Sequence, residues 1–233
     1  MNKIVGINAV REAIATGRVT KLYLQYGFSN KILDMAKKNN IETVFIEKNE
    51  FIKKFGLNSQ GCVGEIKPFK TFSIEEIINS KSENDNDILV ILDELNDPHN
   101  LGAILRSCDV FGVSGVIYKK NNQVQLNSTV AKVSAGAINY VKCCQVVNLT
   151  KTIEFLKKNG YWIIGLDGEA KGDLKSIPDY KKMCIIVGSE GYGISRLVRE
   201  NCDLLAKIPM KGHVSCLNAS VSCAIALYQI VNK

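Results

Sequence analysis

Metal-binding residues are scarce in this sequence. Only two histidines occur among the 233 residues, His99 and His213, and no two cysteines have the Cys-x-x-Cys spacing. Structural zinc sites combine closely spaced cysteines and histidines, so this scarcity argues against zinc, and we expect no metal. The eight cysteines are irregularly spaced. In a chain without a secretory signal they do not indicate a disulfide framework, and we expect small buried residues of a cytoplasmic protein.

Long apolar runs are also missing. No stretch reaches the roughly 18 apolar residues of a membrane-spanning helix. The opening residues 1–6 lack the apolar core of a secretory signal. No run of five or more like charges marks a basic tail. We therefore expect neither a membrane partner nor a basic tail.

Basic residues are in excess, and they are unevenly distributed. The formal net charge is +7. Residues 1–70 contain twelve Lys and Arg against six Asp and Glu, and residues 88–233 contain seventeen against twelve, whereas the short block 71–87 is acidic. Lys and Arg contacts to phosphate supply most of the non-specific affinity of proteins for nucleic acid, so this excess favours a polyanionic partner. Many soluble proteins have a similar charge without such a partner.

The first third of the chain has the pattern of a small α/β domain. Helices are expected at 7–14, 31–38 and 51–55, and strands at 21–24, 42–46 and 62–66. This alternation indicates a βα-type sheet. Residues 68–87 begin with Pro68 and end with 81–87, a polar run without apolar periodicity, and a short helix is expected near 74–78. We therefore predict a domain at 1–67, a linker at 68–87 and a larger domain at 88–233.

The larger domain has the pattern of a parallel α/β sheet. Residues 88–92 form a continuous apolar run, which is typical of a parallel strand covered on both faces. Further strands are expected at 115–118, near 146, and at 162–166, 184–187 and 204–208. Helices are expected at 101–111, 129–138, 150–158 and 194–201, and a last one, capped by Asn218 or Ser220, towards 233. Ligands of such sheets bind beyond the carboxyl ends of the strands.

Two loops at expected strand ends contain residues with functional chemistry. The loop 93–100 ends at Asn100, which occupies the position of a helix N-cap. On the helix that follows, Arg106 lies off the apolar stripe, so it is either a solvated side chain or one directed at phosphate. The glycines of the loop 188–193 allow a ligand to approach the backbone closely. The spacing of that loop does not fit the dinucleotide-binding fingerprint.

A third loop, 208–220, leads from the last strand into the last helix. Proline cannot donate to a strand ladder, so Pro209 makes the backbone leave the sheet. The loop then continues with small and polar residues. Free N–H groups at the start of the following helix suit a polar or anionic ligand.

Together the three loops resemble the three sequence motifs of the SpoU (TrmH-like) family of RNA ribose 2′-O-methyltransferases. The residues that match are Asn100 and Arg106, then Gly188, Ser189, Glu190 and Gly191, then Ile208, Pro209, Met210, Ser215, Leu217, Asn218 and Ser220. Their order and spacing both agree. Residues 1–67 are similar to the small RNA-binding domain, related to a ribosomal-protein fold, of the branch that modifies guanosine in 23S ribosomal RNA.

This resemblance implies a catalytic domain whose C-terminal segment forms a trefoil knot and through which two copies pair as a homodimer. It implies that S-adenosylmethionine is bent in the knot and contacts backbone groups at Gly188, Ile208 and Leu217, with the loop that starts at Leu166 nearby. The other implied cofactor-binding residues are Ser189, Gly191, Met210 and Ser220.

The implied reaction is displacement at a sulfonium methyl by a ribose 2′-hydroxyl, which requires alignment and removal of a proton. In similar enzymes the position of Arg106 is proposed as the general base. An arginine with a pKa above ~12 is a poor base, so a phosphate clamp is the alternative. Asn100, Glu190, Ser215 and Asn218 would position the substrate, with Glu190 as the second candidate base.

One position departs from the family pattern. Cys216 stands where the family usually has a serine before the Leu-Asn pair. A thiol is a weaker hydrogen-bond partner than a hydroxyl, so we expect reduced activity unless Ser215 substitutes.

The leading hypothesis is therefore S-adenosylmethionine-dependent 2′-O-methylation of a guanosine in 23S ribosomal RNA. The alternatives within the family are a tRNA methyltransferase and an antibiotic-resistance rRNA methyltransferase. A non-catalytic RNA-binding or ribosome-assembly factor is the alternative from another class, and a nucleotide-dependent oxidoreductase ranks last.

Overall fold

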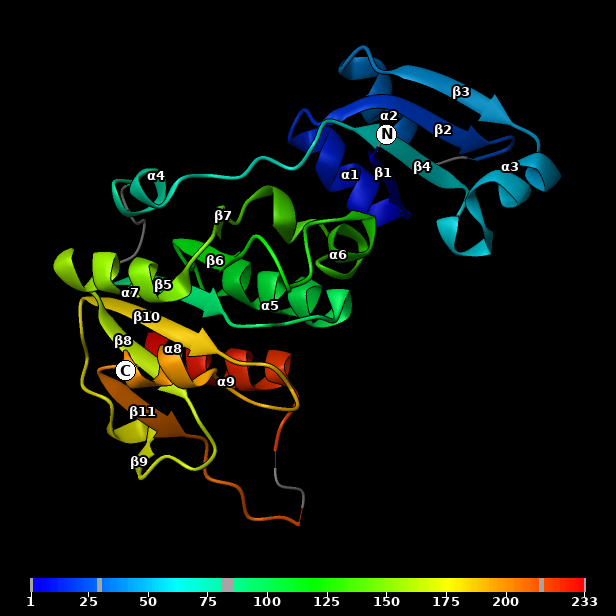
Figure 1. Cartoon of the computed structure of the whole chain (residues 1–233). Coiled ribbons are helices and arrows are strands. Elements are labelled where there is room, and N and C mark those ends of the chain that lie inside the picture. The colour runs from blue at the N-terminus through cyan, green and yellow to red at the C-terminus, as the bar shows by residue number, and fades with distance from the viewer. Residues whose placement is uncertain (1, 29–30, 81–85, 214–215, 233) are drawn as a thin grey trace. The chain divides into compact units, whose positions relative to one another are not determined.

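The computed structural model describes residues 2–28, 31–80, 86–213 and 216–232. The chain forms two compact units, whose elements are labelled in Figure 1. The first unit comprises Met1–Lys70 and Leu126–Tyr140, and the second comprises Thr71–Gln125 and Val141–Lys233. Each unit has its own sheet.

The first unit has a four-stranded sheet of order β1-β4-β2-β3. Its strands are β1 (Asn2–Val5), β2 (Val19–Gln25), β3 (Glu42–Ile46) and β4 (Cys62–Ile66), and its first helices are α1 (Ile7–Ala15), α2 (Lys31–Lys38) and α3 (Lys48–Phe55), with the 3-10 turn η1 (Leu57–Ser59). β2 and β3 are parallel, whereas β4 is antiparallel to β1 and β2. The helices and strands predicted here are confirmed. The pattern does not predict β1, because its four residues do not alternate between polar and apolar.

Residues 126–140 belong to this first unit, although they lie far from it in sequence. The single helix predicted at 129–138 is wrong: α6 (Ser128–Val133) ends early and is followed by the 3-10 turn η2 (Ala137–Asn139). Between them Ala135 and Gly136 have φ angles of 51° and 99°. A Cβ at Gly136 would lie 2.3 Å from the side chain of Glu12, so only glycine allows this approach.

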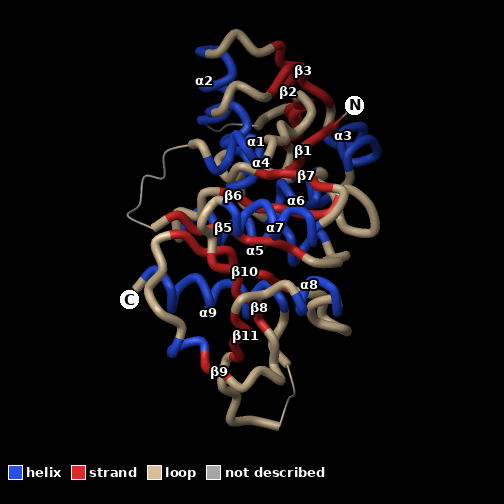
Figure 2. Tube along the Cα trace, turned by 60° about the vertical axis from the view of Figure 1, so that its left-hand side comes forward, coloured by secondary structure: helices blue, strands red, loops and turns tan. Residues whose placement is uncertain are grey.

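The second unit contains a seven-stranded sheet of order β7-β6-β5-β10-β8-β11-β9, and every pair in it is parallel. Its strands are β5 (Asp87–Leu92), β6 (Gly115–Lys119), β7 (Cys143–Val146), β8 (Trp162–Leu166), β9 (Gly172–Asp173), β10 (Lys182–Val187) and β11 (Leu204–Lys207). Its helices are α4 (Ile74–Ile78), α5 (Pro98–Val110), α7 (Leu149–Lys158), α8 (Arg196–Glu200) and α9 (Ala219–Val231), with the 3-10 turn η3 (Leu174–Ser176). Figure 2 shows these strands in succession. The predicted parallel α/β sheet is confirmed.

The central strands of this sheet are buried on both faces, as their continuous apolar runs predict. One face packs with α7, α8 and α4, and Ile77 of α4 is fully buried in that core. Helix α9 packs along α5 and also contacts β10. Helix α9 begins beside the carboxyl ends of β5 and β10, because its cap Asn218 is hydrogen-bonded to Asn100 and Glu190, which follow those strands (Figure 1).

The eight cysteines are all free. Six are buried, as predicted, whereas Cys202 is half-buried and Cys216 is exposed. Burial raises the pKa of Cys62 and of Cys143 to about 12 and that of Cys144 to about 11, so these thiols stay protonated at neutral pH. They are therefore packing residues rather than nucleophiles.

Candidate functional site

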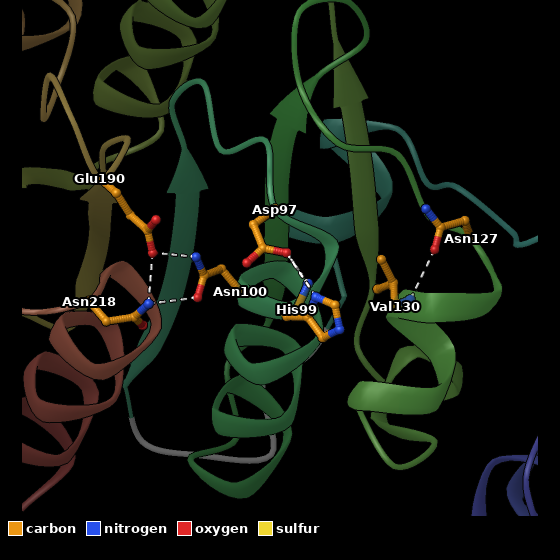
Figure 3. A network of polar contacts seen from close by, with 7 residues as sticks. All are labelled: Asp97, His99, Asn100, Asn127, Val130, Glu190 and Asn218. Carbon is orange, nitrogen blue, oxygen red and sulfur yellow. Dashed lines mark hydrogen bonds and ion pairs between the residues drawn. The ribbon is translucent and has the colours of Figure 1, made fainter. Parts of the chain in front are cut away.

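Three side chains from distant parts of the second unit meet at the carboxyl edge of the sheet (Figure 3). The amide nitrogen of Asn100 donates to Glu190 Oε1 at 2.5 Å, and that of Asn218 donates to the same oxygen at 2.7 Å. Asn218 Nδ2 also lies 2.9 Å from Asn100 Oδ1. The three residues come from α5, from the loop after β10 and from the start of α9. The structure thus brings one residue of each predicted motif into a single hydrogen-bonded triangle.

Asn100 reaches this triangle from inside a helix. The prediction that it occupies the N-cap position is wrong, because α5 starts at Pro98 with Asp97 as its cap. The Asp97 carboxylate accepts from the backbone N–H of His99 at 2.8 Å and lies 3.0 Å from its ring, and these contacts lower the pKa of Asp97. Proline suits the first helical position, since its missing N–H has no partner there. Asn100 is left 5% exposed and directed at Glu190.

The loop after β10 is a tight turn closed on itself. Ser189 and Gly193 exchange two backbone hydrogen bonds of 3.0 Å. A Cβ at Gly188 would lie 2.1 Å from the carbonyl carbon of Gly193 and 2.4 Å from the nitrogen of Ile194. Only glycine fits at position 188, because the backbone of Gly193 and Ile194 passes too close to leave room for a Cβ atom. Glu190 lies within this turn, which places its carboxylate within hydrogen-bonding distance of Asn100 and Asn218.

Asn218 also caps the N-terminus of α9. Its Oδ1 accepts from the backbone N–H of Ser220 at 2.9 Å and from that of Val221 at 3.4 Å. The hydroxyl of Ser220 donates to the same oxygen at 2.6 Å. Asn218, one of the two caps that the sequence predicts, is thus the N-cap of α9, while its amide nitrogen donates to Glu190.

A cavity of about 650 Å³ opens beside this triangle. Seven of the eight predicted cofactor-binding residues line it: Leu166, Gly188, Ser189, Gly191, Ile208, Met210 and Leu217. Glu190 and Cys216 line it as well. Ser220 is not among the lining residues and instead supports the cap of α9.

Some predicted residues lie elsewhere. Arg106 is exposed on α5 and does not line the cavity, and it has no hydrogen bond or ion pair with the residues that the structure describes. At about 100° per residue, its position on α5 is roughly 120° around the helix from Asn100. Ser215 lies outside the described residues.

The sequence patterns miss an ion pair at the wall of the cavity. Arg199 Nε lies 2.6 Å from Asp167 Oδ2, and both residues line the cavity. Burial disfavours the ionised form of Asp167, but hydrogen bonds from the backbone of Glu169 and from Arg199 outweigh it and lower the pKa of Asp167. The pair ties the loop after β8 to α8. The sequence does not signal this pair, because neither Asp167 nor Arg199 belongs to one of the three motifs.

The buried carboxylate of Asp93 links the loop after β5 to the segment that follows the turn Gly188–Gly193. Asp93 follows β5, is 1% exposed, and accepts from the backbone N–H of Ser195 at 2.8 Å. Ser195 follows the turn of Gly188–Gly193. The side chains of Asp93 and Asn100 therefore both link the segment after β5 to the segment after β10.

Within the described ranges, no helix is long and apolar enough to cross a membrane. The same residues include no cluster of three or more His, Cys, Asp or Glu side chains arranged as metal ligands.

A parallel α/β sheet with a cavity at its carboxyl edge defines a class of proteins that bind a small ligand there. Comparison with known proteins narrows that class. A model described as "SpoU rRNA Methylase family" matches residues 87–228, which is more than half of the chain. A second, described as "RNA 2'-O ribose methyltransferase substrate binding", matches residues 3–72. The chain belongs to the SpoU rRNA methylase family of RNA methyltransferases, so the resemblance drawn from the motifs is confirmed at the level of the family.

Relatives of known sequence match over nearly the whole chain, among them two from Staphylococcus species. The "Putative TrmH family tRNA/rRNA methyltransferase" of Staphylococcus haemolyticus is 40% identical, covering 99% of this chain and 95% of its own. The protein of the same name from Staphylococcus aureus is 41% identical over the same shares.

Solved structures agree on the fold. The SpoU methyltransferase AviRb from Streptomyces viridochromogenes, in complex with AdoMet, superimposes with a TM-score of 0.85 at 19% identity and covers 99% of this chain and 89% of its own. An AdoMet-bound rRNA methyltransferase from Sinorhizobium meliloti gives a TM-score of 0.81 at 20% identity, with coverage of 99% and 87%.

Proposed function

We propose that this protein uses S-adenosylmethionine to methylate a ribose 2′-hydroxyl in RNA, with a guanosine of 23S ribosomal RNA as the target. The observation that supports this most is that Asn100, Glu190 and Asn218, one residue from each motif, are hydrogen-bonded together beside a cavity that the second and third motif loops line. The family membership and the AdoMet complex of AviRb, which has a similar fold, support the choice of cofactor.

The cavity suits S-adenosylmethionine in size and in chemistry. Its volume of about 650 Å³ lies within the ~300–1,000 Å³ range of small-ligand pockets. Leu166, Ile208 and Leu217 offer apolar contacts to an adenine ring, and the carboxylates of Asp167 and Glu190 can face the ligand's positive charges. When bound, S-adenosylmethionine supplies a methyl group activated by its sulfonium.

The chain's own residues would align the attacking hydroxyl. Both amides hold Glu190 through Oε1, which leaves Oε2 without a partner among the described residues. Glu190 Oε2 can therefore accept a hydrogen bond from the ribose hydroxyl and receive its proton. Arg106 faces solvent from α5, and we assign it to a phosphate of the RNA rather than to proton removal.

The first unit would supply most of the RNA affinity. Residues 1–67 are proposed as an RNA-binding domain and residues 68–87 as the connection to the catalytic domain at 88–233. The match of residues 3–72 to a substrate-binding model and the basic excess of residues 1–70 support this assignment.

Two further features are proposed from the family resemblance. The C-terminal segment would form a trefoil knot, and two copies would pair through that domain. Exposed apolar side chains along one stripe of α9 support the pairing: Val221 (44% exposed), Ile225 (38%), Tyr228 (61%). Their spacing of i, i+4 and i+7 places them on one helix face.

A methyl-transfer assay tests the function directly. Wild-type protein with labelled S-adenosylmethionine should label deproteinised 23S ribosomal RNA, and nuclease mapping should locate one 2′-O-methylguanosine. Arg106→Ala should abolish labelling while the affinity for S-adenosylmethionine stays nearly unchanged. Labelling of tRNA instead would reassign the substrate, and cofactor binding without labelling of any RNA would favour a non-catalytic RNA-binding factor.

A further inference from the structure

Tyr192 is an exposed aromatic residue at the rim of the cavity. Its side chain is 96% exposed, more than any other large apolar side chain in the described part of the chain. It lies between Gly191 and Gly193 and is one of the residues that line the cavity. An aromatic ring in this position adds nothing to the core, and its exposure has a cost in apolar hydration. A ligand that covers the ring would remove that cost.

The ring is held in this position by a defined turn. The backbone N–H of Tyr192 donates to Ser189 Oγ at 3.3 Å, and the turn is closed by the paired bonds between Ser189 and Gly193. The close approach of Gly188 to Gly193 fixes the base of the turn. The outward position of the tyrosine therefore follows from the same backbone that presents Glu190.

Arg196 adds a positive charge at the same rim. It also lines the cavity, from the first position of α8. It forms an ion pair with Glu200, one turn further along the same helix, with 3.0 Å between Arg196 Nη1 and Glu200 Oε1, and the two side chains are 78% and 54% exposed. Exposed i, i+4 ion pairs are weak, so the guanidinium can exchange Glu200 for a phosphate at little cost.

We propose that Tyr192 and Arg196 form a substrate subsite at the rim of the cavity, where the tyrosine ring stacks on an unpaired nucleobase of the RNA and Arg196 contacts a neighbouring phosphate. This inference rests on the proposed function. Proteins that read single-stranded RNA stack its bases on aromatic side chains and contact its phosphates with Arg and Lys. The subsite would place the nucleotide so that its ribose reaches Glu190, two residues from Tyr192 in the same turn.

Variants of Tyr192 test the stacking. Y192A should raise the KM for RNA about tenfold, in line with the known contribution of one base–aromatic stack. Y192F should restore the wild-type KM because stacking needs the ring and not the hydroxyl, and Y192L should fall between the two. The affinity for S-adenosylmethionine, measured by titration calorimetry, should change less than twofold in all three.

The salt dependence of RNA binding tests Arg196. R196Q should lower the slope of log K against log salt by about 0.7, the value for one phosphate contact on a single strand. Y192A should leave that slope unchanged, since stacking releases no counterion.

Several results would overturn the subsite. These are an unchanged RNA KM in Y192A, a loss of S-adenosylmethionine affinity in place of RNA affinity, or an altered oligomeric state that accounts for the defect. The binding measurements also separate this inference from the proposed function. If the wild type labels no RNA, the function fails, while an RNA affinity that drops in Y192A and recovers in Y192F would still support the subsite.

Discussion

Asn218 uses the two ends of its side-chain amide for different purposes. The oxygen caps α9, and the nitrogen donates to Glu190 and lies beside Asn100. Aspartate has the same shape and caps helices equally well, but it has no donor and would set a second carboxylate against Glu190. The two roles can therefore be separated by substitution.

We expect Asn218→Asp to keep the cap of α9 and to lose activity, because its carboxylate cannot donate to Glu190. Asn218→Ala should lose both, with a drop of about 0.5–2 kcal/mol in the free energy of unfolding for the missing cap. Urea unfolding and the methyl-transfer assay would measure the two effects side by side. Equal stability losses in both variants, or full activity in Asn218→Asp, would show that the triangle does not act as described.

Gly188 is the residue at which a single methyl group should matter most. In Gly188→Ala the new Cβ would overlap backbone atoms of Gly193 and Ile194, so the turn has to open. We expect a loss of about 1–3 kcal/mol in unfolding free energy, as for other overpacked sites, and weaker binding of S-adenosylmethionine. Gly191→Ala is the matched control, because no atom lies within 4 Å of its Cβ position. If Gly188→Ala and Gly191→Ala lost the same unfolding free energy, the close approach of Gly188 to Gly193 would not be what fixes this turn.

At the scale of elements, the ion pair of Asp167 and Arg199 joins the loop after β8 to α8. The pKa of Asp167 is lowered below its ordinary 3.8. A carboxylate with a depressed pKa stabilises the fold above the unfolded-state pKa, and this contribution disappears as the pH falls through the folded-state pKa.

Arg199→Gln should therefore lower the thermal unfolding midpoint at pH 7, and its difference from the wild type should shrink as the pH falls below 3.8. Arg196→Gln, which removes only an exposed pair, should leave the midpoint unchanged at both pH values. A difference that persists undiminished at low pH would mean that Arg199 stabilises the loop by packing instead of by its charge.

The order of the elements could be predicted from sequence because apolar periodicity is local. The buried strand at β5 and the helix-ending Gly112 and Gly160 are signals that neighbouring residues provide. The break in the helix predicted at 129–138 could not be seen, since Gly136 is required by contact with Glu12, which is 124 positions away. The start of α5 was placed too late, because the prediction took Asn100 as the N-cap, whereas α5 begins at Pro98 with Asp97 as its cap.

The candidate site likewise has residues that the sequence predicts and residues that it does not. Asn100, Glu190 and Asn218 belong to short motifs whose order and spacing are visible in the sequence, and the structure brings them together. Asp167 and Arg199 have no motif, and only tertiary packing pairs them. Their contact depends on how the loop after β8 and α8 are placed, which periodicity does not encode.

At the scale of the whole molecule, the apolar stripe of α9 predicts pairing of two chains. Ile225→Asp should convert a homodimer into a monomer, because a buried unpaired charge at the centre of an interface is strongly unfavourable. Light scattering on both proteins would measure the mass. Val147→Asp, at a 79% exposed position after β7, is the control and should remain dimeric. A monomeric wild type, or a dimer unaffected by Ile225→Asp, would contradict the assignment of this face.

A crystal structure grown with S-adenosylmethionine tests most directly whether the three loops share one ligand site. We expect density for the ligand in the cavity, against the backbone of Gly188, Ile208 and Leu217, with Glu190 still held by Asn100 and Asn218. Density at another site, or a structure in which these loops lie apart with no ligand between them, would contradict the account.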